Sequence, residues 1–257
     1  KQLQDRAISA SYITSKLGFK EIEQRLVNAR NGMYDLLYCA PEQLANKRFK
    51  RELEELPLSI IAIDEAHCIS EWGHEFRPIY RQLAEHLSVK TGHVQWLALT
   101  ATATPEVQKD ICYMLGFDDH RTIKLPFKRE NLIWWVIRTE QTIERMISTL
   151  EKVKDRGDGL IYASTRKNSE RWAERLLRNG IKAQAYHAGL SADKRTSIQQ
   201  QWINGKLPWV AATNAFGMGI DKPDCRYVFH EIMPNSLEAY YQEAGRAGRD
   251  GQISYPI

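Results

Sequence analysis

The sequence of 257 residues lacks the features that mark membrane-spanning, zinc-binding and disulfide-rich proteins. No apolar run approaches the roughly 20 residues that span a bilayer, which argues against a membrane protein. No HExxH or comparable histidine spacing occurs, and no CxxC pair, so we expect neither a zinc site nor a disulfide framework in this segment. The cysteines are scattered, which indicates a reducing, intracellular setting; they are Cys39, Cys68, Cys112 and Cys225.

The amino terminus, KQLQDRAISASY, lacks both an initiator Met and the apolar core of a secretion signal. We therefore expect the chain to begin inside a longer gene product. At 257 residues it exceeds the usual size of a single domain, which predicts two lobes that each bury a core.

The net charge of +4 is unevenly divided along the chain. Residues 1–127 hold 16 Lys and Arg against 17 Asp and Glu, whereas residues 128–257 hold 20 against 15. The second half is therefore the basic one. Solvated helix faces and a polyanionic partner both account for an excess of this size, and the charge alone does not separate them.

Short apolar runs alternate with amphipathic stretches along the whole chain, a pattern typical of parallel sheets built from strand–helix–strand units. In residues 1–127 we expect strands at 35–40, 59–64 and 94–100. A helix over 41–53 opens at Pro41, and a second helix over 105–115 follows Thr104 as N-cap and stops at Gly116.

The second lobe is predicted at residues 128–257, after a hinge or linker around 117–131. Its expected strands lie at 132–138, 159–164, 182–187, 209–213 and 225–230. Its expected helices lie at 142–155, 169–180 and 192–205, with another from 237 onward.

Two adjacent carboxylates follow the apolar run SIIAID. Asp64 ends this expected strand and Glu65 comes next, so both emerge at the carboxyl edge of the sheet, where ligands bind in open parallel sheets. One or two carboxylates suit a magnesium ion that also bridges phosphate oxygens, and Glu65 could orient or deprotonate a water. An acid pair that caps the next helix is the alternative.

These acids belong to a set of ordered blocks that spans nearly the whole chain. The blocks are LLYCAPEQL, AIDEAHCISEWGHEFRPIY, LALTATAT, GLIYAS, AYHAGLSADKR, ATNAFGMGIDKP and YYQEAGRAGRDG. Together they resemble the superfamily 2 helicases, and more closely the RecQ DNA helicases. The resemblance implies an α/β fold of two RecA-like lobes, with parallel sheets flanked by helices, of which the first lobe is incomplete here.

The resemblance gives roles to the DEAH block and to the loop after it. Asp64 would assist coordination of Mg²⁺, Glu65 would act on the hydrolytic water, and His67 would couple the nucleotide state to DNA. The aromatic-rich loop would sense single-stranded DNA, because aromatic faces stack on unpaired bases. Its residues here are Trp72, His74, Phe76 and Arg77. Loop aromatics otherwise plug a local core, and Glu71 stands where many members carry Gln.

Further blocks complete the sites that the resemblance implies. Thr100 and Thr102 would link the carboxylates to the DNA path, the alternative being two hydroxyls that begin a helix. Ser164, Thr165, Arg166, His187 and Thr213 follow strands of the second lobe and would grip a DNA backbone without reading sequence.

The block YYQEAGRAGRDG is the second predicted chemical centre. Arg246 and Arg249 would approach the terminal phosphate of ATP, with Arg249 as the arginine finger and Gln242 as a relay. If the helix from 237 continues through both arginines, they project from one face. Gly219 would let the preceding segment approach the nucleotide closely, and Asp221 would lie near the ribose.

The GxxxxGK[ST] loop that cradles nucleotide phosphates is missing from the sequence. We expect truncation rather than divergence, and no appreciable ATPase from these 257 residues alone. Two hypotheses follow for the parent protein. It is an ATP-dependent 3′→5′ DNA helicase acting on single strands and duplex junctions, in the cytoplasm and nucleoid of a bacterium or the nucleus of a eukaryote. Alternatively it is a non-catalytic nucleic-acid-binding or scaffold module that keeps the fold.

Overall fold

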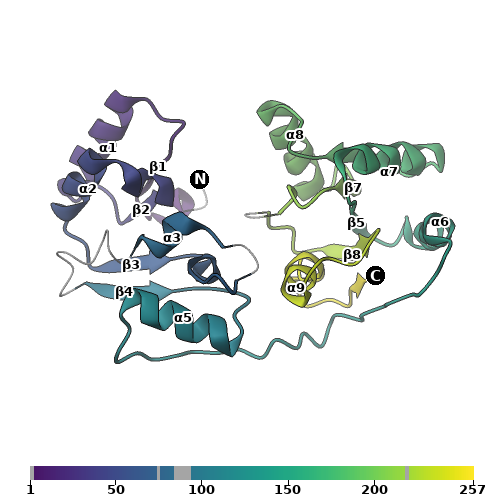
Figure 1. Ribbon diagram of the computed structural model, residues 1–257. Helices are drawn as coiled ribbons and strands as arrows, with labels where there is room; N and C mark the ends of the chain where they lie inside the picture. Colours follow the sequence, from purple (N-terminus) through teal and green to yellow (C-terminus); the bar gives the residue numbers. More distant parts are fainter. Residues whose placement is uncertain (1–2, 74–75, 84–93, 218–219) are drawn as a thin grey trace. The chain divides into compact units, whose positions relative to one another are not determined.

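The computed structural model describes residues 3–73, 76–83, 94–217 and 220–257. The chain divides into two compact units, Lys1–Thr122 and Ile123–Ile257, and each unit is described here by itself. In both units the paired strands run parallel and helices accompany the sheets (Figure 1), which confirms the predicted α/β class. Within the described ranges, no helix is long and apolar enough to cross a bilayer.

Unit 1 holds two short parallel strand pairs. Strand β1 (Ala10–Ile13) pairs with β2 (Leu36–Cys39), and β3 (Ile60–Ile63) pairs with β4 (Gln95–Ala98). The helices are α1 (Phe19–Arg30), α2 (Lys47–Glu54), α3 (Pro78–Arg81) and α5 (Pro105–Leu115), with 3-10 turns η1 (Gln4–Arg6), η2 (Pro41–Ala45) and η3 (Ala66–Ile69). Side chains from these elements form one core, which includes Ile13, Leu26, Ile63, Val107 and Ile111.

The predicted helix over 105–115 is confirmed, and its ends are set by local chemistry. The Thr104 hydroxyl accepts a hydrogen bond from the backbone N–H of Val107, which satisfies one of the free donors of the first turn. Gly116 ends α5 in the left-handed conformation at φ 65°, where a residue without a Cβ is favoured.

The single helix expected over 41–53 is wrong. The chain forms η2 and then α2, because Asn46 between them is extended at φ −83° and ψ 114°. Its side-chain oxygen accepts a 3.4 Å hydrogen bond from the backbone N–H of Phe49, so Asn46 acts as a cap. Asparagine favours caps over helix interiors because its amide competes for backbone groups.

Unit 2 is organised around one five-stranded sheet with strand order β6-β7-β5-β8-β9. The strands are β5 (Asp158–Tyr162), β6 (Ala183–Tyr186), β7 (Trp209–Ala212), β8 (Cys225–His230) and β9 (Tyr255–Pro256). All pairings are parallel, so the carboxyl ends of β5, β6, β7 and β8 lie at the same edge. The residues of this unit that are predicted to contact DNA follow β5, β6 and β7 at this edge.

Both faces of this sheet are buried. Leu160 packs in a cluster with Trp202 of α8 (Ala192–Ile203), whereas the next residue, Ile161, packs in a second cluster with α6 (Thr142–Val153) and α7 (Arg166–Arg178). Successive side chains of a strand point to opposite faces, which divides the core in this way. The continuous apolar runs of β5 and β7 follow from this two-sided burial.

The strand expected at 132–138 is wrong. Only Leu132 forms a bridge, to Ser254, while the N–H groups of Ile133 and Trp135 donate to the carbonyls of Ser254 and Pro256. The aromatic rings pack instead, since Trp135 lies against Tyr255. Val136 is 75% exposed, and residues 133–138 form no strand, so this apolar run lies outside the sheet.

The helix from 237 does not continue through the two arginines. Helix α9 (Leu237–Ala244) ends at Gly245, and the chain then turns through Gly248 in the left-handed conformation at φ 56°. Arg246 and Arg249 therefore extend from turns and not from one helical face. Glycine releases the backbone from helical geometry here.

Candidate nucleotide and nucleic-acid sites

The two carboxylates of the DEAH block lie directly after β3, at its carboxyl end. The Asp64 side chain accepts a 2.9 Å hydrogen bond from the backbone N–H of Glu65. Glu65 has φ 50° and ψ 44°, a left-handed conformation that costs a residue with a Cβ about 1–3 kcal/mol. Strain of this kind persists where the surrounding structure fixes the backbone, and it is frequent at functional positions.

His67 connects this segment with the one after β4. Its side chain is 1% exposed, and Nδ1 lies 3.0 Å from the Thr100 hydroxyl and 3.3 Å from a Glu65 carboxylate oxygen. The Thr100 hydroxyl in turn accepts from the backbone N–H of Thr102. The structure thus links four predicted site residues from two separate segments in a chain of polar contacts. Their order along it is Glu65, His67, Thr100 and Thr102.

The acid pair fits a magnesium ion that is shared with phosphate. Within the described ranges no three His, Cys, Asp or Glu side chains are grouped so that they could hold a metal by themselves. Magnesium in nucleotide sites takes one or two carboxylates, with waters and phosphate oxygens as the other ligands. Asp64, directly after β3, offers carboxylate oxygens of the kind that such a site uses.

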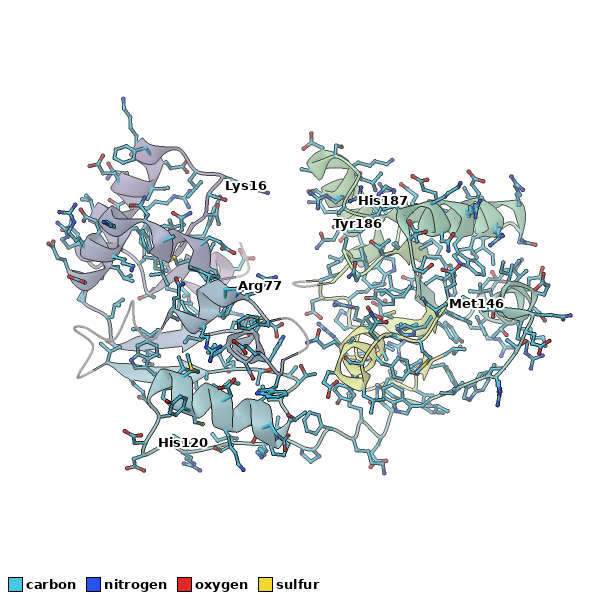
Figure 2. The ribbon with its side chains drawn as sticks, viewed as in Figure 1. Lys16, Arg77, His120, Met146, Tyr186 and His187 are labelled. Atoms are coloured by element: carbon cyan, nitrogen blue, oxygen red, sulfur yellow. The ribbon has the colours of Figure 1, made fainter. Side chains whose placement is uncertain are left out.

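The aromatic-rich loop exposes its tryptophan. Trp72 is 80% exposed, while Phe76 and Arg77 are half-buried. Figure 2 labels Arg77. Gly73 allows the turn, because a Cβ there would lie 2.3 Å from the carbonyl oxygen of His67. The predicted residue His74 lies outside the described residues.

An open hollow beside Trp72 contains residues that sequence reasoning missed. It has a volume of about 480 Å³ and is lined by Trp72 together with Glu106, Lys109, Asp110 and Tyr113 of α5. Tyr113 is 83% exposed, so two accessible aromatic rings line the same hollow. The sequence shows Tyr113 as an aromatic residue within α5, but it does not show that this residue lies beside Trp72.

In unit 2, Ser164 lies beyond the end of β5 and contacts a carboxylate that sequence reasoning did not identify. Both the backbone N–H and the hydroxyl of Ser164 donate to Glu231 at 2.9 Å, and Asn168 donates to the same carboxylate. Burial opposes ionisation, but these donors outweigh it and lower the pKa of Glu231. Thr165 caps α7, its hydroxyl accepting from the N–H of Asn168.

His187 and Thr213 follow β6 and β7 at the same edge as Ser164. His187, which Figure 2 labels beside Tyr186, is buried at 5% exposure, and its Nε2 lies 3.1 Å from a Glu170 oxygen. The N–H of Thr213 donates to the carbonyl of Tyr186, next to His187. Arg166 is exposed at the start of α7, and its guanidinium lies near Gly189. The edge therefore combines all five residues that were predicted from separate strands.

Arg246 lies beside a buried aromatic pair. Burial raises the pKa of Tyr162, and the nearby Arg246 partly opposes this shift. Tyr162 stacks on His230 with ring centroids 5.3 Å apart, and His230 Nε2 lies 3.0 Å from a Glu243 oxygen on α9. Gln242, the predicted relay, precedes Glu243 on the same helix and is half-buried.

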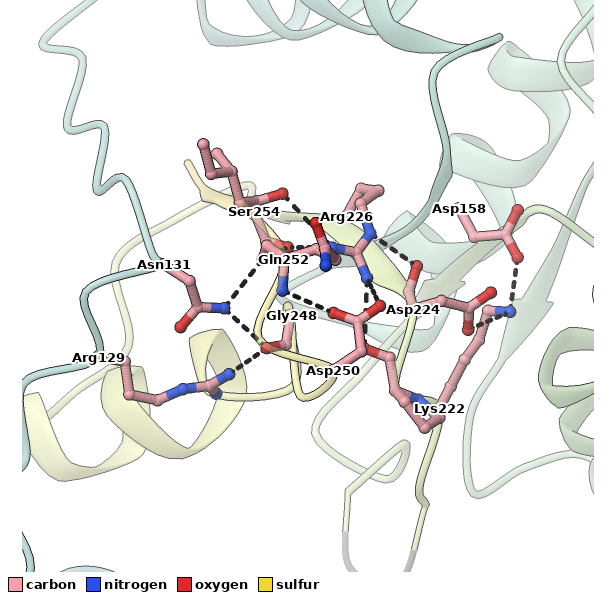
Figure 3. Close-up of polar contacts among 12 residues, drawn as sticks. Arg129, Asn131, Asp158, Lys222, Asp224, Arg226, Gly248, Asp250, Gln252 and Ser254 are labelled. Carbon is pink, nitrogen blue, oxygen red and sulfur yellow. Dashed lines mark hydrogen bonds and ion pairs between the residues drawn. The ribbon is translucent and has the colours of Figure 1, made fainter.

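Arg249 is paired with another predicted site residue. Its guanidinium donates at 2.9 Å to Asp221, and the two side chains are 40% and 71% exposed. The next residue, Lys222, is 2% exposed and contacts Asp158 at 2.7 Å and Asp224 at 3.0 Å (Figure 3). Burial alone would lower the pKa of Lys222, but the two carboxylates outweigh it and raise the pKa. The predicted Gly219 lies outside the described residues.

Two family models match the chain. The DEAD/DEAH box helicase model covers residues 1–111, and the helicase conserved C-terminal domain model covers residues 140–251. They correspond to the two units and together span most of the sequence.

Relatives and solved structures agree with these matches. The chain is 44% identical, over 98% of its length, to the ATP-dependent DNA helicase RecQ of Bacillus subtilis, and 40% identical, over 99%, to the ATP-dependent helicase SGS1 of Saccharomyces cerevisiae. It covers 42% and 18% of those proteins, so it spans less than half of their length. The fold matches the Mycobacterium smegmatis helicase Lhr with a TM-score of 0.73 at 19% identity, over 100% of this chain and 36% of that one. This likeness confirms the RecA-like helicase fold.

Proposed function

The chain belongs to the RecQ family of DEAD/DEAH box helicases, and we propose that it forms part of the motor core of an ATP-dependent 3′→5′ DNA helicase. In this proposal ATP hydrolysis drives translocation on single-stranded DNA and unwinding of duplex in repair or recombination. One observation carries it: the Glu65 carboxylate after β3 and the Thr100 hydroxyl after β4 both contact the buried His67. A DNA substrate places the protein in the nucleoid of a bacterium or the nucleus of a eukaryote.

The nucleotide chemistry is proposed for the DEAH carboxylates. Asp64 would hold Mg²⁺, which supplies charge neutralisation at phosphate oxygens when bound. Glu65 would orient the attacking water and take its proton, for which a carboxylate held in a fixed backbone conformation is suited. The contact of His67 with both Glu65 and Thr100 supports a role in relaying the state of this site.

The arginines of unit 2 are proposed to act on the phosphates. Arg249 is the candidate finger, because it is partly exposed and its carboxylate partner, Asp221, is itself mostly exposed. Arg246 would bind a phosphate as well, with Gln242 as relay. Gly219 would let its segment approach the nucleotide closely, and Asp221 would lie near the ribose. Guanidinium groups suit this role because they stay charged and bind phosphate oxygens in pairs.

Contacts with DNA are proposed on both units. The exposed Trp72 would stack on an unpaired base, with His74, Phe76 and Arg77 completing the loop. The strand-end group of unit 2 would contact the sugar–phosphate backbone; it comprises Ser164, Thr165, Arg166, His187 and Thr213. The accessible hydroxyls and the exposed Arg166 support this part of the proposal.

The test is strand separation by the full-length protein. We expect ATP-dependent unwinding of a duplex with a 3′ single-stranded tail, and none with a 5′ tail. Glu65→Gln should lower turnover by about 10²- to 10⁴-fold, the usual contribution of a general base, and leave ATP binding intact. Glu151→Gln, an exposed position on α6, is the matched control.

Normal turnover in Glu65→Gln would contradict the role of this residue. DNA binding without any ATP hydrolysis by the wild-type protein would instead favour the scaffold alternative. For the 257-residue chain alone we expect no hydrolysis, because its sequence holds no phosphate-binding GxxxxGK[ST] loop.

A further inference from the structure

The turn that carries both arginines, residues 245–251 and here called the arginine loop, is rich in glycine. Its sequence GRAGRDG has three glycines, and Gly248 and Gly251 adopt left-handed conformations. Glycine-rich turns retain the most backbone freedom in the unfolded chain, so fixing them requires contacts from outside the turn.

Arg129 spans the loop with a single side chain. One guanidinium nitrogen donates to the carbonyl of Gly245 at 2.9 Å, and another donates to the carbonyl of Gly248 (Figure 3). These two carbonyls bracket Arg246 in the sequence. Gly245 is also the C-cap of α9, where a cation is favoured by the free carbonyls and the helix dipole.

Asn131 holds the same turn from the neighbouring position. Its side-chain amide donates to the carbonyls of Gly248 at 2.8 Å and Gln252 at 2.9 Å. The fit is close, because a Cβ at Gly248 would lie 2.6 Å from that amide nitrogen. The carbonyl of Gly248 thus accepts from two side chains that come from a segment more than a hundred residues away.

The far side of the loop is fixed separately. Arg226, the second residue of β8, forms an ion pair with Asp250 and donates to the Ser254 hydroxyl at 3.0 Å (Figure 3). Both flanks of Arg249 are therefore held, while the Arg249 side chain itself remains 40% exposed. A fixed backbone with a projecting guanidinium is the arrangement that phosphate binding needs.

We propose that Arg129 and Asn131 are positioning residues that set the arginine loop for its reaction. This inference rests on the proposed function of Arg246 and Arg249, and it gives a role to the segment 126–131, which the sequence predicts to be part of a linker. The contacts of Arg129 with the loop go to neutral carbonyls, so its charge adds to the positive potential of the arginines without cancelling it. Lysine cannot replace it, because an ammonium group does not present the planar fork that reaches two carbonyls.

The experiment uses the full-length protein with Arg129→Lys and Asn131→Ala. Lys128→Ala is the matched control, since Lys128 is 76% exposed and its ion pair is with the equally exposed Glu130. Two quantities are measured for each protein: backbone hydrogen exchange in residues 245–251, and kcat and KM for ATP in the presence of DNA.

We expect exchange in residues 245–251 to rise by about tenfold or more in both variants, because each loses side-chain hydrogen bonds that hold the carbonyls of this loop. Exchange in β5 and β7 should stay unchanged. The kcat should fall by about 10- to 100-fold, because small displacements of a catalytic group are costly, while KM changes far less. Lys128→Ala should alter neither quantity.

Unchanged exchange in the loop would overturn the inference, and so would faster exchange throughout unit 2, which would indicate a purely structural role. Arg249→Ala is measured alongside. If it abolishes turnover, while Arg129→Lys and Asn131→Ala show faster loop exchange but wild-type kcat, the inference is overturned too. If Arg249→Ala retains wild-type turnover, the proposed role of the arginines fails, and the exchange data alone decide whether Arg129 and Asn131 hold the loop.

Discussion

At the scale of single residues, carboxylates organise the strand ends of unit 2. Glu231 accepts from Ser164 and Asn168, Glu170 contacts His187, and Glu243 contacts His230. Each acid holds a side chain or a turn at the edge where β5, β6 and β8 end. These acids gave no signal in the sequence, because an isolated Glu in a helix or after a strand does not reveal its partner.

The stability contributed by Glu231 should depend on pH. Its pKa is lowered in the folded protein, so its contribution is present above the unfolded pKa of about 4.3 and is lost as the pH falls through the folded value. We therefore expect Glu231→Gln to lower the free energy of unfolding at pH 7, and the difference from wild type to shrink steadily below about pH 4. Urea unfolding at a series of pH values measures this.

The control for that series is Glu151→Gln, at an exposed position on α6. A destabilisation by Glu231→Gln that stays constant from pH 7 to pH 3 would contradict the assignment. Ordinary loss of packing, without linkage to ionisation, would then explain it.

At the scale of elements, the connection from η3 to α3 depends on a close backbone approach. The N–H of Gly73 donates to the carbonyl of Ser70, and the N–H of Ser70 donates to the carbonyl of His67. Successive turns of this kind place Trp72 at the surface, directly after the buried residues of η3. The exposure of the tryptophan is thus a property of the turn and not of its own side chain.

We expect Gly73→Ala to disturb this turn, because its Cβ would lie 2.3 Å from the His67 carbonyl oxygen. Overpacking of this kind typically costs about 1–3 kcal/mol. In the full-length protein, stimulation of ATP turnover by single-stranded DNA should fall more than basal turnover, which steady-state assays with and without DNA will show.

Gly18→Ala is the matched control in the same unit. Gly18 precedes α1 at φ −67°, and a Cβ there would meet nothing within 4 Å. Equal loss of basal and stimulated turnover in Gly73→Ala would argue against a sensing role for the loop. A wild-type response would show that the turn tolerates the extra methyl group.

At the scale of the whole molecule, the two units differ in how well their sheets are buried. In unit 2 every residue of β7 is buried. In the described part of unit 1, β3 and β4 form a two-stranded pair that leaves Ile60 58% exposed and Leu97 47% exposed. Parallel sheets are normally covered on both faces, so unit 1 gains less from burial of its strands.

We expect this difference to appear as unequal stability of the two units. In native-state hydrogen exchange of the 257-residue chain, the amides of β5, β7 and β8 should exchange at least about tenfold more slowly than those of β3 and β4. A urea series should show unit 1 opening first. Equal protection in all five strands would contradict this and would indicate a single cooperative transition.

The sequence by itself determined the α/β class, most element positions and the family. Periodicity and turn residues are local, as Thr104 and Gly116 at the ends of α5 illustrate. The local pattern failed where a neighbour decided the outcome. The apolar run after Asn131 reads as a strand, yet its aromatics pack on Tyr240, Tyr241 and Tyr255 instead.

Only the tertiary structure decided which polar groups meet. His67 and Thr100 are 33 residues apart, and Arg129 and Gly245 are 116 residues apart. A charged or hydroxyl side chain can bond to any partner that the fold brings within about 3 Å, and nothing in its local sequence specifies which. The residue types of the sites were therefore readable from the chain, whereas the hydrogen bonds that hold them in place followed from the packing of distant segments.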